Sequence, residues 1–78
     1  MTPREKNLAD IGVIAYKHNF TVEDMLGKRR YKRIVEVRRE CVAMLRAKGY
    51  STTEIGRIMN RDHSTIVHSL QMLAVKNG

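Results

Sequence analysis

The sequence predicts an all-α protein, a small helical domain of 78 residues. Three observations predict this class: apolar residues recur every three or four positions in each long segment, no segment shows the alternation of a strand, and residues typical of helix caps separate the segments. A chain of this length buries about 60% of its surface on folding and has no room for a second core. Residues 1–78 are therefore expected to form a single domain.

The first helix is expected to begin after Thr2, a suitable N-cap, with Pro3 at its first position and Glu5 completing a capping box. Helical spacing extends to about His18. The residues expected on its buried face are Leu8, Ile11, Ile14 and Ala15.

Thr21 is suited to cap a short second helix over residues 22–26. A third helix is expected after the basic loop 28–33, and it should end near Lys48 because Gly49 suits the left-handed conformation that closes a helix. Its apolar residues, three or four positions apart, are Ile34, Val37, Cys41, Met44 and Leu45.

Two helices joined by a tight turn are expected at about residues 51–75. Ser51 and Glu54 form a second capping box, Asn60 suits the turn, and Asp62 is the expected N-cap of the last helix. This layout is that of a helix-turn-helix, whose second helix enters the major groove of DNA with its N-terminus first.

The charge pattern favours a polyanionic partner such as nucleic acid. The chain has 15 Lys and Arg against 8 Asp and Glu, a net charge of +7. Residues 28–48 contain nine of the basic residues and two of the acidic ones, so this segment holds the whole excess. A solvated charged face is the ordinary alternative interpretation of such a segment.

The composition also argues against a membrane protein, a secreted protein, a metalloprotein and an enzyme. No apolar run approaches the roughly 20 residues of a membrane helix, and the N-terminus lacks the apolar region of a secretory signal, so a cytoplasmic protein without membrane contact is expected. The single cysteine, Cys41, and two histidines five positions apart, His63 and His68, match no zinc or catalytic motif. No metal, cofactor or enzymatic residue is predicted, and three tyrosines are too few for a single-strand stacking platform.

Two motifs carry a more specific signal: EIG at residues 54–56 and RDHSTIVH at residues 61–68. Together with the segment 27–70 around them, they resemble the C-terminal DNA-binding domain, domain IV, of the bacterial replication initiator DnaA. The likeness implies a Trp-repressor-like helix-turn-helix that binds short asymmetric duplex sites, the DnaA boxes, as a monomer. It further implies a recognition helix in the major groove, a basic-loop arginine in the minor groove, and a role in replication initiation or its control at the nucleoid.

The resemblance and the side-chain chemistry give the expected DNA contacts. Arg61 suits guanine or a phosphate, Asp62 accepts from cytosine N4, and His63 donates or accepts. The residues expected to contact bases are Arg30, in the minor groove, and Arg61, Asp62, His63 and Ser64, in the major groove. Those expected to contact phosphates are Lys28, Arg29, Lys32, Arg38, Arg39, Arg46, Thr53, Thr65 and His68.

The chain departs from the family pattern in its turns. Val37 stands where the family usually has proline, so the third helix is expected to begin earlier or bend less. The segment between Arg46 and Ser51 is one residue shorter, and Asn60 replaces a Gly-Gly pair. These changes put the tilt of the recognition helix and the preferred site in question.

No GxxxxGK[ST] loop occurs, so the ATPase module that precedes this domain in the family is not in this sequence. Two alternatives therefore stay open. One is a small protein-interaction module with a replication protein as partner, or an inhibitor of a host initiator. The other is a transcription regulator that uses the same fold on another site.

Overall fold

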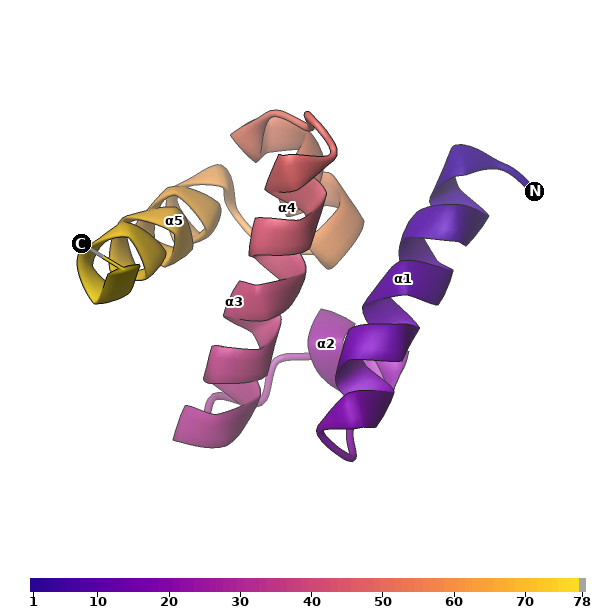
Figure 1. The fold of residues 1–78 in the computed structure, drawn as a ribbon, viewed down its shortest axis with the longest axis horizontal. Helices are drawn as coiled ribbons and strands as arrows, with labels where there is room; N and C mark the ends of the chain where they lie inside the picture. Colours follow the sequence, from indigo (N-terminus) through magenta and orange to yellow (C-terminus); the bar gives the residue numbers. More distant parts are fainter. Residues whose placement is uncertain (78) are drawn as a thin grey trace.

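The computed structural model describes residues 1–77, which form five helices and no strand (Figure 1). The all-α prediction is confirmed. The helices are α1 (Pro3–Lys17), α2 (Val22–Leu26), α3 (Lys32–Ala47), α4 (Thr52–Met59) and α5 (His63–Asn77). Helix α3 lies at the centre and contacts each of the other four. No helix in this range has the length and apolar character needed to cross a membrane.

Local capping determines where the helices begin. The Ser51 and Glu54 capping box is confirmed: Glu54 N donates to Ser51 Oγ at 3.2 Å, and Ser51 N donates to Glu54 Oε1 at 2.9 Å. The backbone bond from Ser51 lowers the pKa of Glu54, and the side-chain bond lowers it further. At α1 only half of the predicted box forms. Glu5 N donates to Thr2 Oγ1 at 3.2 Å, but the Glu5 carboxylate accepts from the Thr2 hydroxyl, which competes with the backbone as donor.

The turns follow the sequence prediction, with one change in the basic loop. Gly49 and Asn60 both adopt left-handed backbone, with φ of 97° and 57°. Helix α3 begins at Lys32, however, so the irregular part of the basic loop covers residues 28–31 instead of 28–33. Val37 lies within α3 and keeps the backbone N–H that a proline would lack.

The core draws side chains from all five helices. Its fully or almost fully buried members are Ile11, Ala15, Met25, Ile34, Val37, Cys41, Val42, Leu45, Ile55, Met59 and Ile66. On α3 this confirms the predicted stripe except for Met44, which is partly buried while Val42 is buried. On α1 the buried face is rotated. Leu8 and Ile14 are only partly buried, and the polar side chain of Asn7 is buried in their place.

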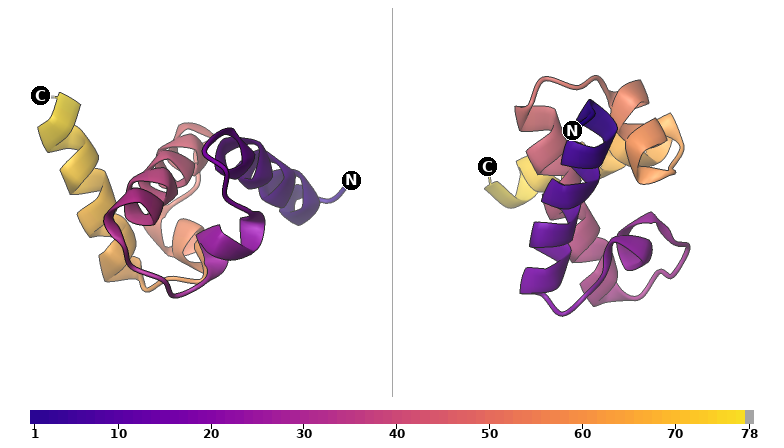
Figure 2. Two further views of the ribbon diagram at one scale, coloured as in Figure 1. Left: turned by 90° about the horizontal axis from the view of Figure 1, so that it is seen from below. Right: turned by 90° about the vertical axis from the view of Figure 1, so that its right-hand side faces the viewer.

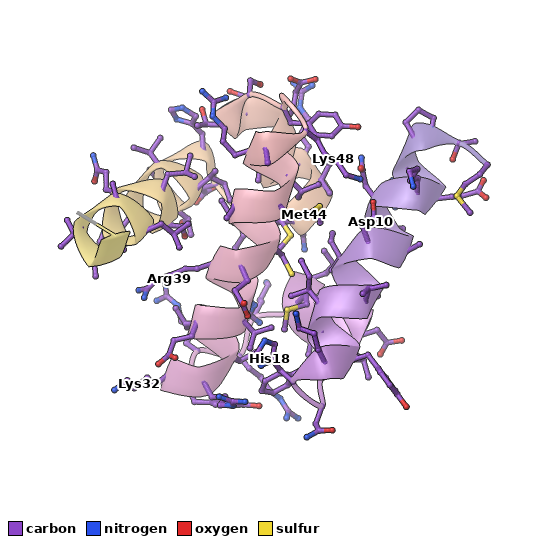
Figure 3. The ribbon with its side chains drawn as sticks, viewed as in Figure 1. Asp10, His18, Lys32, Arg39, Met44 and Lys48 are labelled. Carbon is purple, nitrogen blue, oxygen red and sulfur yellow. The ribbon has the colours of Figure 1, made fainter. Side chains whose placement is uncertain are left out.

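Buried Asn7 is stabilised by hydrogen bonds that connect α1 to the turn before α4. Its Nδ2 donates to the Tyr50 hydroxyl at 2.9 Å, and its Oδ1 accepts from Lys48 Nζ at 3.0 Å. Lys48 Nζ also contacts the Asp10 carboxylate, and the two side chains point toward one another between α1 and α3 in Figure 3. The hydrogen bond from Lys48 lowers the pKa of Asp10.

Cys41 is expected to be unreactive in the folded protein. The residue has no exposed surface, and burial, together with the charge of Glu40, raises the pKa of its thiol to about 12. Because the thiolate is the nucleophile, Ellman's reagent at mildly alkaline pH should modify the folded protein far more slowly than the denatured protein. Equal rates would contradict the buried position. Because the pKa is raised on folding, the free energy of unfolding should also fall as the pH rises from the ordinary thiol value toward about 12.

Gly56 is expected to be required for the approach of α4 to the turn before α5. Arg61 N donates to Gly56 O at 2.7 Å, and a Cβ on Gly56 would stand 2.7 Å from the Arg61 carbonyl oxygen. Gly56→Ala should therefore lower the free energy of unfolding by about 1–3 kcal/mol, although alanine is the better helix former. Urea denaturation measures this loss.

The matched control for Gly56 is Gly12→Ala in α1. Its Cβ would meet the Val22 side chain at 3.2 Å, and a methyl group yields more easily than a backbone carbonyl. The control should lose less stability than Gly56→Ala. If Gly56→Ala is as stable as the wild type, the turn before α5 can move away from the added Cβ at little cost, and Gly56 is not required there.

Candidate nucleic-acid interface

One open groove runs between the loop after α2, the middle of α3 and the helix pair α4–α5. It has a volume of about 1110 Å³, and we name it the basic groove. Its charged and histidine lining residues are Lys28, Arg30, Arg38, Arg39, Arg57, Arg61, Asp62, His63 and His68. Six of these are basic and one is acidic, so the groove presents a positive surface suited to a polyanion.

The basic loop and the start of α5 lie on the same side of the molecule. Arg30 of the loop, Asp62 and His63 all line the basic groove. Figure 2 (left) shows the chain between α2 and α3 passing beside the turn that joins α4 to α5. A weak hydrogen bond from Asn60 Nδ2 to Leu26 O, at 3.5 Å, joins the two segments there. This arrangement allows one ligand to touch the loop and the tip of α5 together.

The N-terminal tip of α5, residues 62–64, exposes polar side chains, while the apolar side of the helix faces the core. The Asp62 carbonyl accepts from Thr65 N at 3.1 Å and from Ile66 N at 3.3 Å, which puts Asp62 at the N-cap position. Ile66 is buried, whereas Asp62, His63 and Ser64 are exposed. The three exposed side chains therefore surround the positive end of the helix dipole, where a ligand can reach them.

Arg38 is held inside the protein by backbone carbonyls. Its side chain is 8% exposed, and its guanidinium donates from Nε to Met25 O at 3.1 Å and from Nη2 to Asp24 O at 2.7 Å and Gly27 O at 2.8 Å. Nη1 donates to Arg29 O. Every nitrogen of this guanidinium already binds a backbone carbonyl, so in the free protein Arg38 has no unused donor for the predicted phosphate contact.

Arg61 is also turned toward the protein. Its Nη1 donates to Asn60 O at 3.0 Å and to Leu26 O at 3.4 Å, and its Nη2 donates to Gly27 O. Both terminal nitrogens face the backbone near the basic loop, and the side chain is only partly exposed. In the free protein Arg61 therefore contacts the backbone of the basic loop, and its predicted base contact stays a prediction.

The other predicted residues fall into two sets. Besides Arg30, Asp62 and His63, the groove is lined by Lys28, Arg39, Thr53, Thr65 and His68. Arg39 points from α3 toward the α5 side of the molecule in Figure 3. Four predicted contacts lie outside the groove lining: Arg29, Lys32, Arg46 and Ser64.

The four outlying residues have distinct surroundings. Arg29 is exposed in the basic loop, and its backbone carbonyl accepts from Arg38. Ser64 is exposed beside His63, and Lys32 stands in the first turn of α3, which has no acidic residue. A lysine there is repelled by the positive N-terminal end of the helix dipole, and a bound anion such as a phosphate would offset this repulsion. Arg46 lies near the other end of α3, where its Nη1 donates to Tyr50 O at 2.8 Å.

Arg57 is a candidate that the sequence reasoning missed. Its side chain is exposed on α4 and lines the basic groove. Arg57 follows Thr53, a predicted phosphate contact, by four residues and so shares its helix face. That spacing was the signal that could have identified it.

The comparison with protein families agrees with this geometry. A family model described as the bacterial DnaA protein helix-turn-helix matches residues 10–72, which includes the whole basic groove. No curated protein and no solved structure matches the chain. The family consists of DNA-binding domains and is not a family of enzymes, so double-stranded DNA is the partner it implies. The chain belongs to the bacterial DnaA helix-turn-helix family.

Proposed function

We propose that this protein binds duplex DNA sequence-specifically, as a monomer, at sites of the DnaA-box type, and acts in replication initiation or its control in the bacterial cytoplasm. One observation carries the proposal. Arg30 and the exposed tip of α5 line the same positively charged groove, although they are more than thirty positions apart in the chain.

In the major groove, the bases are read by the exposed tip of α5. The Asp62 carboxylate accepts from cytosine N4, the His63 imidazole donates or accepts, and the Ser64 hydroxyl does either. All three side chains are exposed in the free protein, so none must leave a buried site in order to reach a base.

In the minor groove, Arg30 reads the shape of the duplex. A narrow A·T minor groove concentrates negative potential, and an exposed guanidinium on a loop is able to enter it. The phosphates on either side are contacted by the remaining polar and basic residues, of which the lysines and arginines neutralise their charge. These are Lys28, Arg29, Lys32, Arg39, Arg46, Thr53, Arg57, Thr65 and His68.

A fluorescence-anisotropy titration tests the proposal. The full chain is titrated against a labelled duplex that carries a DnaA box and against a duplex of the same composition in shuffled order, at several salt concentrations. We expect at least about tenfold tighter binding to the box, and a slope of log K on log salt of about −5 to −6 for five to seven phosphate contacts. Equal affinity for both duplexes would overturn sequence-specific binding and favour a module that docks on a protein.

A further inference from the structure

Two guanidinium groups from different parts of the chain converge on one short stretch of backbone. Arg38 of α3 binds the carbonyls of Asp24, Met25, Gly27 and Arg29. Arg61, from the turn before α5, binds those of Leu26 and Gly27. The Gly27 carbonyl therefore accepts from both arginines, and residues 24–29 are held between α3 and the start of α5.

The stretch needs such partners because it cannot satisfy its own carbonyls. The last carbonyls of any helix lack partners within the helix, and α2 has only five residues. The loop after it, residues 28–31, has no regular structure. A guanidinium offers five donors in a rigid plane, so two of them suffice to bind this series of acceptors.

We propose that Arg61, with Arg38, is a positioning residue that fixes the basic loop, and hence Arg30, relative to Asp62 and His63 before DNA binds. This inference rests on the proposed function. A loop that is ordered in advance loses less conformational freedom on binding, so the affinity for a duplex that fills both grooves is higher.

The charges around the pair agree with this role. Burial lowers the pKa of both guanidinium groups, and the nearby charge of Arg30 lowers both further. Three cations therefore lie within electrostatic reach of one another. The hydrogen bonds to Gly27 and its neighbours hold two of them in place, which leaves Arg30 exposed at the groove.

The first measurement needs no DNA. Backbone ¹⁵N relaxation of the free protein is compared for the wild type, Arg61→Met and the matched control Arg46→Met. The control also loses one charge, and it loses one guanidinium–carbonyl bond where Arg61→Met loses three, but at the end of α3 away from the loop. In Arg61→Met we expect the order parameters of residues 28–30 to fall from about 0.85 to below about 0.6, with no such fall in the control.

Arg61→Lys keeps the charge and lacks the planar fork, so the same fall is expected for it. This variant also serves if Arg61→Met does not fold, as checked by circular dichroism. Unchanged order of residues 28–30 in the folded Arg61 variant would overturn the inference and leave the proposed function standing.

The second measurement is a double-mutant cycle on the box duplex with Arg61→Met and Arg30→Ala. If Arg61 acts by positioning Arg30, its loss should weaken binding by about tenfold in the wild type and by about twofold or less when Arg30 is already absent. Equal losses in both backgrounds would mean that Arg61 acts on DNA by itself, and would overturn the inference. Failure of the wild type to prefer the box would overturn the proposed function, and with it any role of the pair in binding.

Discussion

Replacing Arg38 with methionine is expected to lower the free energy of unfolding by about 2–4 kcal/mol, because it leaves a set of poorly hydrated carbonyls without donors. Methionine fills the space of the arginine stem, so the loss reports mainly on the guanidinium. The carbonyls of Asp24, Met25 and Arg29 lose the guanidinium at once, and that of Gly27 keeps only its bond from Arg61. Urea denaturation followed by circular dichroism measures the change, and the melting temperature should fall by roughly 10–20 °C.

The neighbouring residue provides the matched control. Arg39 differs from Arg38 by one position, is partly exposed and lines the basic groove. Arg39→Met should change stability by less than about 0.5 kcal/mol. It should weaken binding to box and shuffled duplexes alike, and reduce the magnitude of the salt slope by about 1. Equal stability losses in the two variants would contradict the different roles that the structure gives these adjacent arginines.

Replacing His63 with alanine is expected to reduce discrimination between the box and a shuffled duplex by about 1–3 kcal/mol, because an imidazole at a base edge distinguishes one base pair from another. His63 is exposed at the first position of α5, so its removal should leave the free energy of unfolding almost unchanged. Titrations of both duplexes with the variant give the ratio directly.

His68→Ala is the control for this experiment. It removes the same kind of side chain from the same helix, at an exposed position that also lines the groove but lies five residues farther along. A phosphate contact there carries no sequence information, so the affinity of the variant should fall by the same factor for both duplexes. If His63→Ala behaves in the same way as His68→Ala, His63 does not read bases.

Much of the fold was predictable because its signals are local. The capping box of Ser51 and Glu54 and the left-handed residues Gly49 and Asn60 act within a few positions of themselves, and all were identified correctly. The rotated face of α1 was not predictable in this way. Asn7 is buried because Tyr50 and Lys48, more than forty positions away, meet its amide group.

In the candidate interface, too, the local features were predictable and the contacts between distant segments were not. The helix-turn-helix motif and the basic segment 28–48 were evident in the sequence, and they led to the family and to most of the groove-lining residues. The helix face that Arg57 shares with Thr53 can be read from the sequence, but its place in the groove depends on how α5 packs against α4.

The sequence by itself determined an all-helical protein with the DnaA motif, because helix caps, apolar periods and short motifs need only neighbouring residues. The tertiary structure alone decided which arginines face outward. Arg38 and Arg61 look no different from Arg39 in the sequence, but their carbonyl partners lie 9–14 and up to 35 positions away. A guanidinium binds whichever acceptors folding brings within its reach, and that outcome is fixed by packing between distant segments.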